Sequence, residues 1–180
     1  MLQEKLAVQP AIAAGRFVLR PLRAADAGPI ARHTADPRVA EGTRGIPHPL
    51  PPGTAEAFVA WALSDRRDGD VWAIDASALG GDEVLGIVSL TRLGGDQSEV
   101  RFWVAPEVWN AGYASEAVQA LVAANPHGSR TLFAEVFQDQ AASARVLSNA
   151  GFAYLGDAET FSVARGAARV PTWTYIRRMG

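Results

Sequence analysis

The residues best placed to do chemistry lie between Glu99 and Ala120, where a strand runs through a turn into a helix. Four of the five residues 100–104 are β-branched or aromatic, which is typical of a buried strand. After Gly112, apolar residues recur at helical spacing, so we predict a helix that begins near Ala114 or Ser115. A turn at the start of a helix points several backbone N–H groups at one place, next to the positive end of the helix dipole. The stretch therefore predicts a site for an anion, most often a phosphate.

Two common phosphate loops do not fit this turn. The Walker pattern needs Lys and Ser or Thr after its last glycine, but Tyr113 and Ala114 follow Gly112. The dinucleotide fingerprint needs three spaced glycines, and the turn has one. Residues 109–114 (WNAGYA) instead resemble the acetyl-CoA loop of the GNAT acetyltransferases, and WVAPEVWNAGYASEA resembles the subgroup of ribosomal-protein N-terminal acetyltransferases.

The resemblance implies a set of residues that bind acetyl-CoA. These are Trp103, Val104, Trp109, Asn110, Ala111, Gly112, Tyr113, Ala114, Ser115, Gln140 and Ser143. Asn110 and Ala111 depart from the subgroup pattern and remove one glycine and one basic residue, which concerns affinity more than identity because backbone amides do most of the phosphate binding. For this stretch alone, the alternative is a strand-to-helix turn that binds no ligand.

A second stretch, residues 137–152, resembles the later motif of the same family. Gln140 stands where the family usually has Asn, and Ser143 matches a Ser that is suspected of donating a proton to the leaving thiolate. Many other members use a Tyr one turn later, but Leu147 occupies that position here. The alternative for Ser143 is an ordinary first-turn serine that satisfies the backbone.

The reaction that the resemblance implies moves an acetyl group from a thioester to an amine. It requires removal of a proton from the amine, stabilisation of an oxyanion and protonation of the thiolate, but no protein nucleophile, in agreement with the absence of Cys. Glu99, which opens the strand EVRFWVA, is the preferred general base, and Glu159 is the rival. For each of them the alternative is an ordinary carboxylate in water.

Other residues of interest carry less weight. The histidines, His33, His48 and His127, are scattered without metal-ligand spacing, so we expect no metal site. His48 lies between two prolines and is a candidate for the wall of the acceptor cleft. Trp61 and Trp72 are expected in the core, with either one a candidate for facing the acceptor.

Composition excludes several classes of protein. The 180 residues are 48% apolar, with a net charge of −2 and a pI of about 5.9. The sequence shows no basic face of the kind that nucleic-acid binding proteins have, so we do not expect nucleic acid as a ligand. No apolar run reaches the roughly 18 residues of a membrane span. We expect one cytoplasmic domain over residues 16–180, after a loosely held lead-in at 1–15.

The order of expected elements defines the fold class. It is one strand, helices, three strands, a helix, a strand, a helix and terminal strands, which is an α/β layout with a mixed sheet flanked by helices and matches the GNAT fold. We expect the chain to end in a hairpin formed by residues 160–164 and 172–178.

Two functions follow as hypotheses. The first is an acetyl-CoA-dependent N-acetyltransferase whose acceptor is a primary amine, on a peptide or protein N-terminus or on a small molecule. The second is a GNAT-fold module that has lost catalysis and binds CoA as a sensor ligand or not at all. Homodimers are common among similar proteins, and neither nucleic acid nor membrane is expected as a partner.

Overall fold

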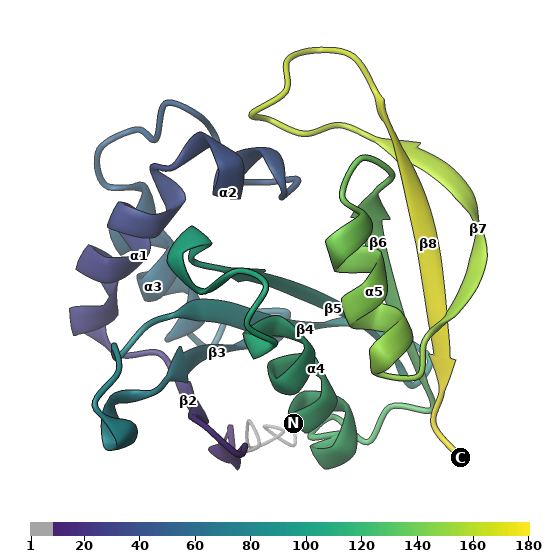
Figure 1. Ribbon diagram of the computed structural model, residues 1–180, viewed down its shortest axis with the longest axis horizontal. Coiled ribbons are helices and arrows are strands. Elements are labelled where there is room, and N and C mark those ends of the chain that lie inside the picture. Colours follow the sequence, from purple (N-terminus) through teal and green to yellow (C-terminus); the bar gives the residue numbers. More distant parts are fainter. Residues whose placement is uncertain (1–8) are drawn as a thin grey trace, which may run out of the picture.

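Eight strands form one sheet in the computed structural model, which describes residues 9–180. Their order is β1-β2-β3-β4-β5-β6-β8-β7 (Figure 1). The strands are β1 (Ile12–Ala13), β2 (Val18–Pro21), β3 (Gly69–Asp75), β4 (Gly86–Gly94), β5 (Gln97–Val104), β6 (Thr131–Phe137), β7 (Ala153–Thr160) and β8 (Val170–Arg178). The helices are α1 (Ala27–Thr34), α2 (Pro37–Glu41), α3 (Thr54–Ala62), α4 (Tyr113–Ala124) and α5 (Ala141–Asn149).

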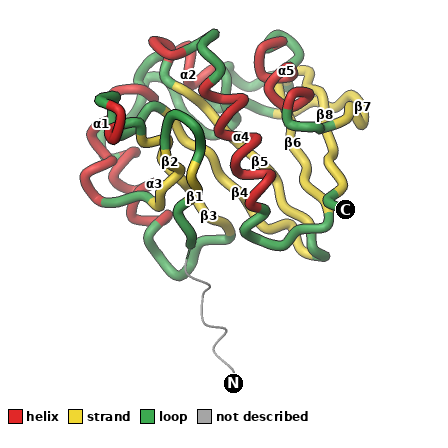
Figure 2. The backbone as a smooth tube through the Cα atoms, turned by 60° about the horizontal axis from the view of Figure 1, so that its bottom comes forward, coloured by secondary structure: helices red, strands yellow, loops and turns green. Residues whose placement is uncertain are grey.

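Helices cover both faces of this sheet, and each does so through an apolar stripe. On α4 the buried side chains Ala117, Val118, Leu121 and Val122 recur at helical spacing and pack with α5 against the larger core cluster. The helices α1 and α3 pack against the other face, over a smaller cluster that includes Val71 and Ile87. The predicted α/β layout with a mixed sheet is therefore confirmed, and Figure 2 shows the two groups of helices on either side of the strands.

The sheet is antiparallel except where β5 meets β6. These two strands run parallel because the helix α4 connects them, and they pair over only three positions, from Gln97↔Thr131 to Glu99↔Phe133. Beyond Glu99 the strands separate. Beyond the last paired position, Glu99↔Phe133, the backbone groups of β5 that face β6 have no partner in the ladder, and a gap opens in the middle of the sheet.

The N-terminal part of the chain differs from our expectation. Residues 9–15 are not a loose lead-in, because Ile12 and Ala13 pair with β2 and the side chain of Gln9 donates a hydrogen bond to the carbonyl of Val71. Ile12 is also buried in the larger core cluster. The described part of this segment therefore forms one edge of the sheet, whereas residues 1–8 of the expected lead-in lie outside the described residues.

The first strand of the terminal hairpin lies earlier in the chain than predicted. Its first strand, β7, begins at Ala153 and ends at Thr160, so residues 161–164 belong to the connecting loop and not to a strand. This loop lies against the segment that follows α2, where the Ser162 hydroxyl donates to the carbonyl of Thr43 and Arg165 donates to the carbonyl of Glu41. The segment after α2 and the loop between β7 and β8 thereby lie side by side, at the top of Figure 1.

A buried polar cluster joins β3 and β5 to the loop before β6. His127 Nε2 lies 2.7 Å from Asp70 Oδ2, and its Nδ1 lies 3.3 Å from the hydroxyl of Ser98, which in turn contacts Ser129 at 2.9 Å. Burial would raise the pKa of the Asp70 carboxyl, but hydrogen bonds from His127 and Arg67 outweigh this effect and leave that pKa below its ordinary value. The cluster is fully hydrogen-bonded, so it acts as a structural cross-link.

Two further findings concern metals and membranes. Among residues 9–180 there is no group of three or more His, Asp or Glu side chains arranged to hold a metal ion. In the same part of the chain, no helix combines the length and the apolar character needed to cross a bilayer.

Candidate active site

The predicted phosphate-binding turn is present between β5 and α4. Asn110 and Gly112 adopt positive φ angles of 60° and 82°, a conformation that Gly and Asn tolerate better than other residues. The indole N–H of Trp109 donates to the carbonyl of Val104 at 2.8 Å and closes the turn over the end of β5. The helix begins at Tyr113, directly after Gly112, so its first amides face the turn.

Arg16 holds this turn from the N-terminal side. Its Nε lies 2.7 Å from Glu116 Oε2, and a terminal nitrogen donates to the carbonyl of Ala111 at 2.9 Å. The guanidinium also lies over the ring of Tyr113, with its central carbon 4.0 Å from the ring centroid. Glu116 therefore does more than complement the dipole of α4, because it anchors the arginine that fixes the turn.

A cavity of about 420 Å³ opens between this turn and the start of α5. All the residues that the resemblance assigns to the cofactor line it, with the exception of Ala111, whose carbonyl is taken by Arg16. Two basic side chains that sequence reasoning missed also line it, Arg38 from α2 and Arg145 from α5. They lie on opposite walls of the cavity and supply positive charge that the turn itself lacks.

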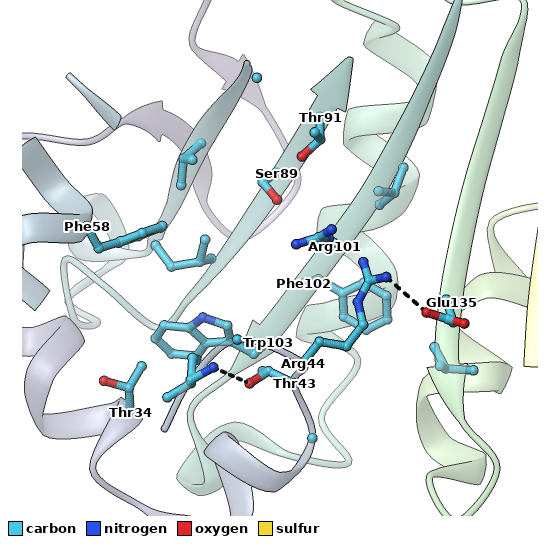
Figure 3. Close-up of a pocket in the computed structure, with 18 of the residues that line it drawn as sticks. Thr34, Thr43, Arg44, Phe58, Ser89, Thr91, Arg101, Phe102, Trp103 and Glu135 are labelled. Carbon is cyan, nitrogen blue, oxygen red and sulfur yellow. Dashed lines mark hydrogen bonds and ion pairs between the residues drawn. The ribbon is translucent and has the colours of Figure 1, made fainter. Parts of the chain in front are cut away.

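A second cavity, of about 330 Å³, lies on the face of the sheet that α1 and α3 cover. Its walls are largely apolar and aromatic, with Phe58 and Trp61 stacked at 6.1 Å between ring centroids and Trp103 forming part of the floor. Figure 3 shows its polar side chains, which include Ser89, Arg101 and Glu135.

The two cavities meet at the gap between β5 and β6. Five residues line both of them, namely Gly42, Phe102, Trp103, Gln140 and Ser143. A ligand in the first cavity can therefore present a reactive group to a ligand in the second. The strand edge of β5 at this point carries backbone groups without a partner on β6, and these are available to a ligand that extends along it.

Gln140 and Ser143 occupy the start of α5 at this junction. Gln140 is the N-cap residue, and its carbonyl accepts the backbone N–H of Ser143 at 3.0 Å. The amide side chain of Gln140 lies against Gly42, where an added Cβ would be 3.1 Å from the Gln140 Oε1. The longer amide side chain is thus accommodated by a glycine on the facing segment, and Ser143 sits in the first turn of the helix as predicted.

Arg44 spans the gap between two carboxylates. Its guanidinium lies 2.5 Å from Glu99 Oε1 on β5 and 2.9 Å from Glu135 Oε1 on β6. Glu99 also pairs with Arg101 at 2.5 Å, whereas Glu135 accepts the hydroxyl of Thr172 at 2.8 Å. Glu135, which sequence reasoning missed, lines the second cavity directly (Figure 3), whereas Glu99 is not among the lining residues and reaches the cavity through Arg44 and Arg101.

The structure places Glu159 elsewhere. Side chains of a strand alternate between the two faces of a sheet, and Thr160 faces the second cavity, so Glu159 points to the opposite face. It is more than half exposed and lies 3.4 Å from Arg169. His48 does not line the cavity, although its neighbours Ile46 and Leu50 do.

The two tryptophans named from the sequence have different surroundings. Trp61 lines the second cavity, whereas Trp72 is fully buried and donates a hydrogen bond to the carbonyl of Pro10. One tryptophan therefore lines the second cavity and the other belongs to the core.

Comparisons with known proteins agree with this geometry. A protein-family model described as an acetyltransferase (GNAT) domain matches residues 16–153, and the chain therefore belongs to the GNAT acetyltransferase family. The predicted family is confirmed, and with it the class of enzyme. A search of curated protein sequences returned no match.

Solved structures share the fold along almost the whole chain. The ribosomal L7/L12 α-N-protein acetyltransferase RimL, in complex with CoA, is 16% identical, with a TM-score of 0.77 and coverage of 94% of this chain and 98% of that one. The ribosomal-protein-S5-alanine acetyltransferase of Vibrio fischeri is 17% identical, with a TM-score of 0.75 and coverage of 94% and 97%. The spermidine N-acetyltransferase of Vibrio cholerae, in complex with CoA and spermine, is 13% identical, with a TM-score of 0.75 and coverage of 91% and 95%.

Proposed function

We propose that this chain transfers the acetyl group of acetyl-CoA directly to a primary amine held in the cavity beneath α1 and α3. The observation that carries the proposal is the junction of the two cavities, where the start of α5 and the free edge of β5 face the same point. In this arrangement the cofactor lies in the cavity beside the turn, with its phosphates at the start of α4 and its pantetheine arm along β5. The thioester then reaches the junction.

The reaction requires one bond to form and one to break. The amine nitrogen attacks the thioester carbonyl carbon, a tetrahedral oxyanion forms, and its collapse breaks the C–S bond and releases CoA. One proton leaves the nitrogen and one is taken up by the thiolate. In our proposal, unpaired backbone N–H groups on the edge of β5 stabilise the oxyanion, and the Ser143 hydroxyl donates the proton to the thiolate.

A carboxylate assists the loss of the proton from the amine. Glu99 remains the base proposed from the sequence, and Glu135 joins it as a candidate because it lines the acceptor cavity and shares Arg44 with Glu99. Proton transfer through a bridging water is compatible with either residue. The distant position of Glu159 makes it the control among the three carboxylates.

The test measures CoA release from acetyl-CoA with a broad set of primary amines. We expect Glu99→Gln or Glu135→Gln, whichever removes the base, to lower kcat by about 10²–10⁴-fold, and Glu159→Gln to change it little. Ser143→Ala should lower kcat while calorimetric binding of acetyl-CoA stays close to that of the wild type. A chain that binds acetyl-CoA but releases no CoA with any amine would contradict the proposal.

A binding module that has lost catalysis is the second candidate. The observation that favours it is the pairing of Glu99 Oε1 with both Arg44 and Arg101, because an oxygen held by two guanidinium groups is less accessible to an amine or a bridging water. If the chain is such a module, substitutions at Glu99 and Ser143 either change the affinity for CoA or have no effect, because there is no turnover for them to lower. Calorimetric titration with acetyl-CoA and with dephospho-CoA, followed by the assay for CoA release, separates the two candidates.

A further inference from the structure

We propose that the acceptor is a small zwitterion, a primary amine that carries a carboxylate on an apolar body, as an amino acid does. The inference rests on the proposed function, because it names the substrate class of the same site. It is carried by a row of hydrogen-bond donors that lies on the floor of the acceptor cavity and that neither the fold nor the transfer reaction explains.

The row consists of Ser89 and Thr91 on β4 and Arg101 on β5. Ser89 and Arg101 are directly opposite each other in the antiparallel register, and Thr91 follows two positions later on the same face of the strand. All three line the cavity, and Figure 3 shows them side by side on the two neighbouring strands. Their side chains therefore converge on one region of the floor.

These groups have donors to spare. Neither hydroxyl has a hydrogen-bond partner among residues 9–180, and within the same range Arg101 makes its one side-chain hydrogen bond through Nε, to Glu99. Its side chain is 54% exposed, which leaves the terminal nitrogens open to the cavity. Guanidinium nitrogens donate and never accept, so the group that satisfies all three side chains together is an oxyanion.

The local charge favours a carboxylate over a phosphate. Glu99 and Glu135 offset Arg101 and Arg44, so the junction is close to neutral and already holds two carboxylates. A dianionic phosphate would be repelled by both, whereas a single negative charge is matched to the planar guanidinium of Arg101. The carboxylate of Glu135 on the far wall lies where it can attract the ammonium group of the acceptor before that group loses its proton.

The rest of the cavity suits an apolar body. The stacked rings of Phe58 and Trp61 face the donor row from α3, and Ile46 and Leu50 complete this wall. Apolar walls with a few polar groups at fixed positions are the usual arrangement of a site for a small molecule. A carboxylate at the donor row, an ammonium near Glu135 and a side chain against the rings together describe an aromatic or aliphatic amino acid.

The experiment compares matched pairs of acceptors that differ by the carboxylate alone. The pairs are L-phenylalanine with 2-phenylethylamine, L-tyrosine with tyramine, L-tryptophan with tryptamine and L-leucine with isoamylamine. For at least one pair we expect the wild-type kcat/KM to favour the amino acid by about tenfold or more. The reason is that the decarboxylated amine leaves the hydrogen-bond donors of the site without a partner. Arg101→Gln should reduce this preference about tenfold, mainly by raising KM for the amino acid, because the decarboxylated amine has no carboxylate for the arginine to bind; an effect transmitted through Glu99 acts on both members of a pair and cancels in their ratio.

Two further variants complete the design. The double substitution Ser89→Ala and Thr91→Val keeps the arginine and should reduce the preference by a smaller factor, which provides a test if Arg101→Gln does not fold. Arg130→Gln, at an exposed position outside both cavities, is the matched control and should change nothing. Equal kcat/KM values within every pair for the wild type, or equal losses for both members of a pair in Arg101→Gln, would overturn the inference.

A binding measurement separates this inference from the proposed function. Calorimetry with N-acetyl-L-phenylalanine and N-acetyl-2-phenylethylamine requires no turnover. If the carboxylated product binds more tightly and Arg101→Gln removes the difference, the acceptor class is supported even when no CoA is released, and the proposed function alone fails. If both products bind equally to an active enzyme, the transfer reaction stands and the inference of a zwitterionic acceptor is overturned.

Discussion

At the scale of single residues, the cofactor cavity obtains its positive charge from an unexpected direction. Asn110 and Ala111 leave the phosphate-binding turn without a basic side chain, but Arg38 and Arg145 reach the same cavity from α2 and α5. Arg145 is exposed and has no ion-pair partner among residues 9–180, whereas Arg38 pairs with the neighbouring Asp36. The departure of the turn from its family pattern is therefore offset by residues distant in sequence.

We expect Arg145→Gln to weaken binding of acetyl-CoA roughly fivefold, because an exposed pairing with a phosphate contributes about 1 kcal/mol. The loss should shrink as salt rises, since exposed charges are screened over about 8 Å at physiological ionic strength. Calorimetric titration at low and high salt measures both effects, with Arg130→Gln as the control. An unchanged affinity at low salt would show that Arg145 does not contact the cofactor.

The buried cluster around Asp70 gives the stability a predictable dependence on pH. The pKa of Asp70 is lower in the folded chain than in the unfolded chain, so its contribution is complete above the ordinary aspartate value of about 4 and is lost as pH falls through the folded-state value. Asp70→Asn should reduce the free energy of unfolding by about 3 kcal/mol at pH 7, because it removes the negative charge and leaves an NH2 group facing one of the two donors, His127 or Arg67.

Urea unfolding between pH 3 and pH 7 measures this difference. The gap between Asp70→Asn and the wild type should narrow below about pH 4, where the wild-type carboxyl takes up its proton. Asp96→Asn, at an exposed position, is the control and should show no such gap. If the difference in free energy of unfolding between the wild type and Asp70→Asn stayed constant across this range, the ionised form of Asp70 would not be the source of the stability.

At the scale of elements, Arg44 connects β5 and β6 by ion pairs where their backbone hydrogen bonding ends. The strands pair over three positions, and just beyond them the guanidinium connects Glu99 on one strand to Glu135 on the other. Arg44 comes from the segment after α2, and its carbonyl accepts the backbone N–H of Val163 in the hairpin loop. One residue thus connects three elements around the site.

We expect Arg44→Met to lower the free energy of unfolding by about 2 kcal/mol, because the largely buried carboxylate of Glu135 loses its cation and Glu99 keeps only Arg101. Adding Glu135→Gln to this variant should recover part of the loss, since it removes the unpaired charge. The double-mutant cycle is measured by urea unfolding at pH 7. Strictly additive losses would show that Arg44 and Glu135 do not interact.

Features that depend on neighbouring residues in the sequence could be predicted, whereas contacts between residues far apart in the sequence could not. The turn at Gly112 and the helix after it were predictable because the signals are local, and a short motif pointed to Ser143 and Gln140, which both line the cavity beside the turn. The contact of Arg44 with Glu135 joins positions 91 residues apart and depends on how β5 and β6 separate. Glu159 was misjudged as a neighbour of the site because the alternation of β7 could not be fixed before its register was known.

At the scale of the molecule, the site lies where two halves of the sheet meet. One half, β1 to β5, carries α1, α3 and the turn, and the other half, β6 to β8, carries α5. Because the cofactor cavity takes its walls from both halves, a ligand in it holds them together. Binding should therefore stabilise the whole fold and not one element alone.

We expect acetyl-CoA at 100 times its Kd to stabilise the chain by about 2.7 kcal/mol, which raises Tm by roughly 5–10 °C for a protein of this size. Differential scanning fluorimetry measures the shift, and dephospho-CoA, which lacks one phosphate, should produce a smaller one at equal concentration. If Tm did not change at millimolar acetyl-CoA, the proposal that the cavity beside the turn binds acetyl-CoA would be contradicted.

The position of the two cavities on either side of the gap also sets the order of events in catalysis. In the proposed arrangement donor and acceptor occupy separate cavities, so both can be bound at once and neither has to leave before the other arrives. No side chain needs to carry the acetyl group between them. Steady-state rates should therefore follow a sequential mechanism through a ternary complex, and a bisubstrate analogue that joins CoA to an amino acid should bind more tightly than either part.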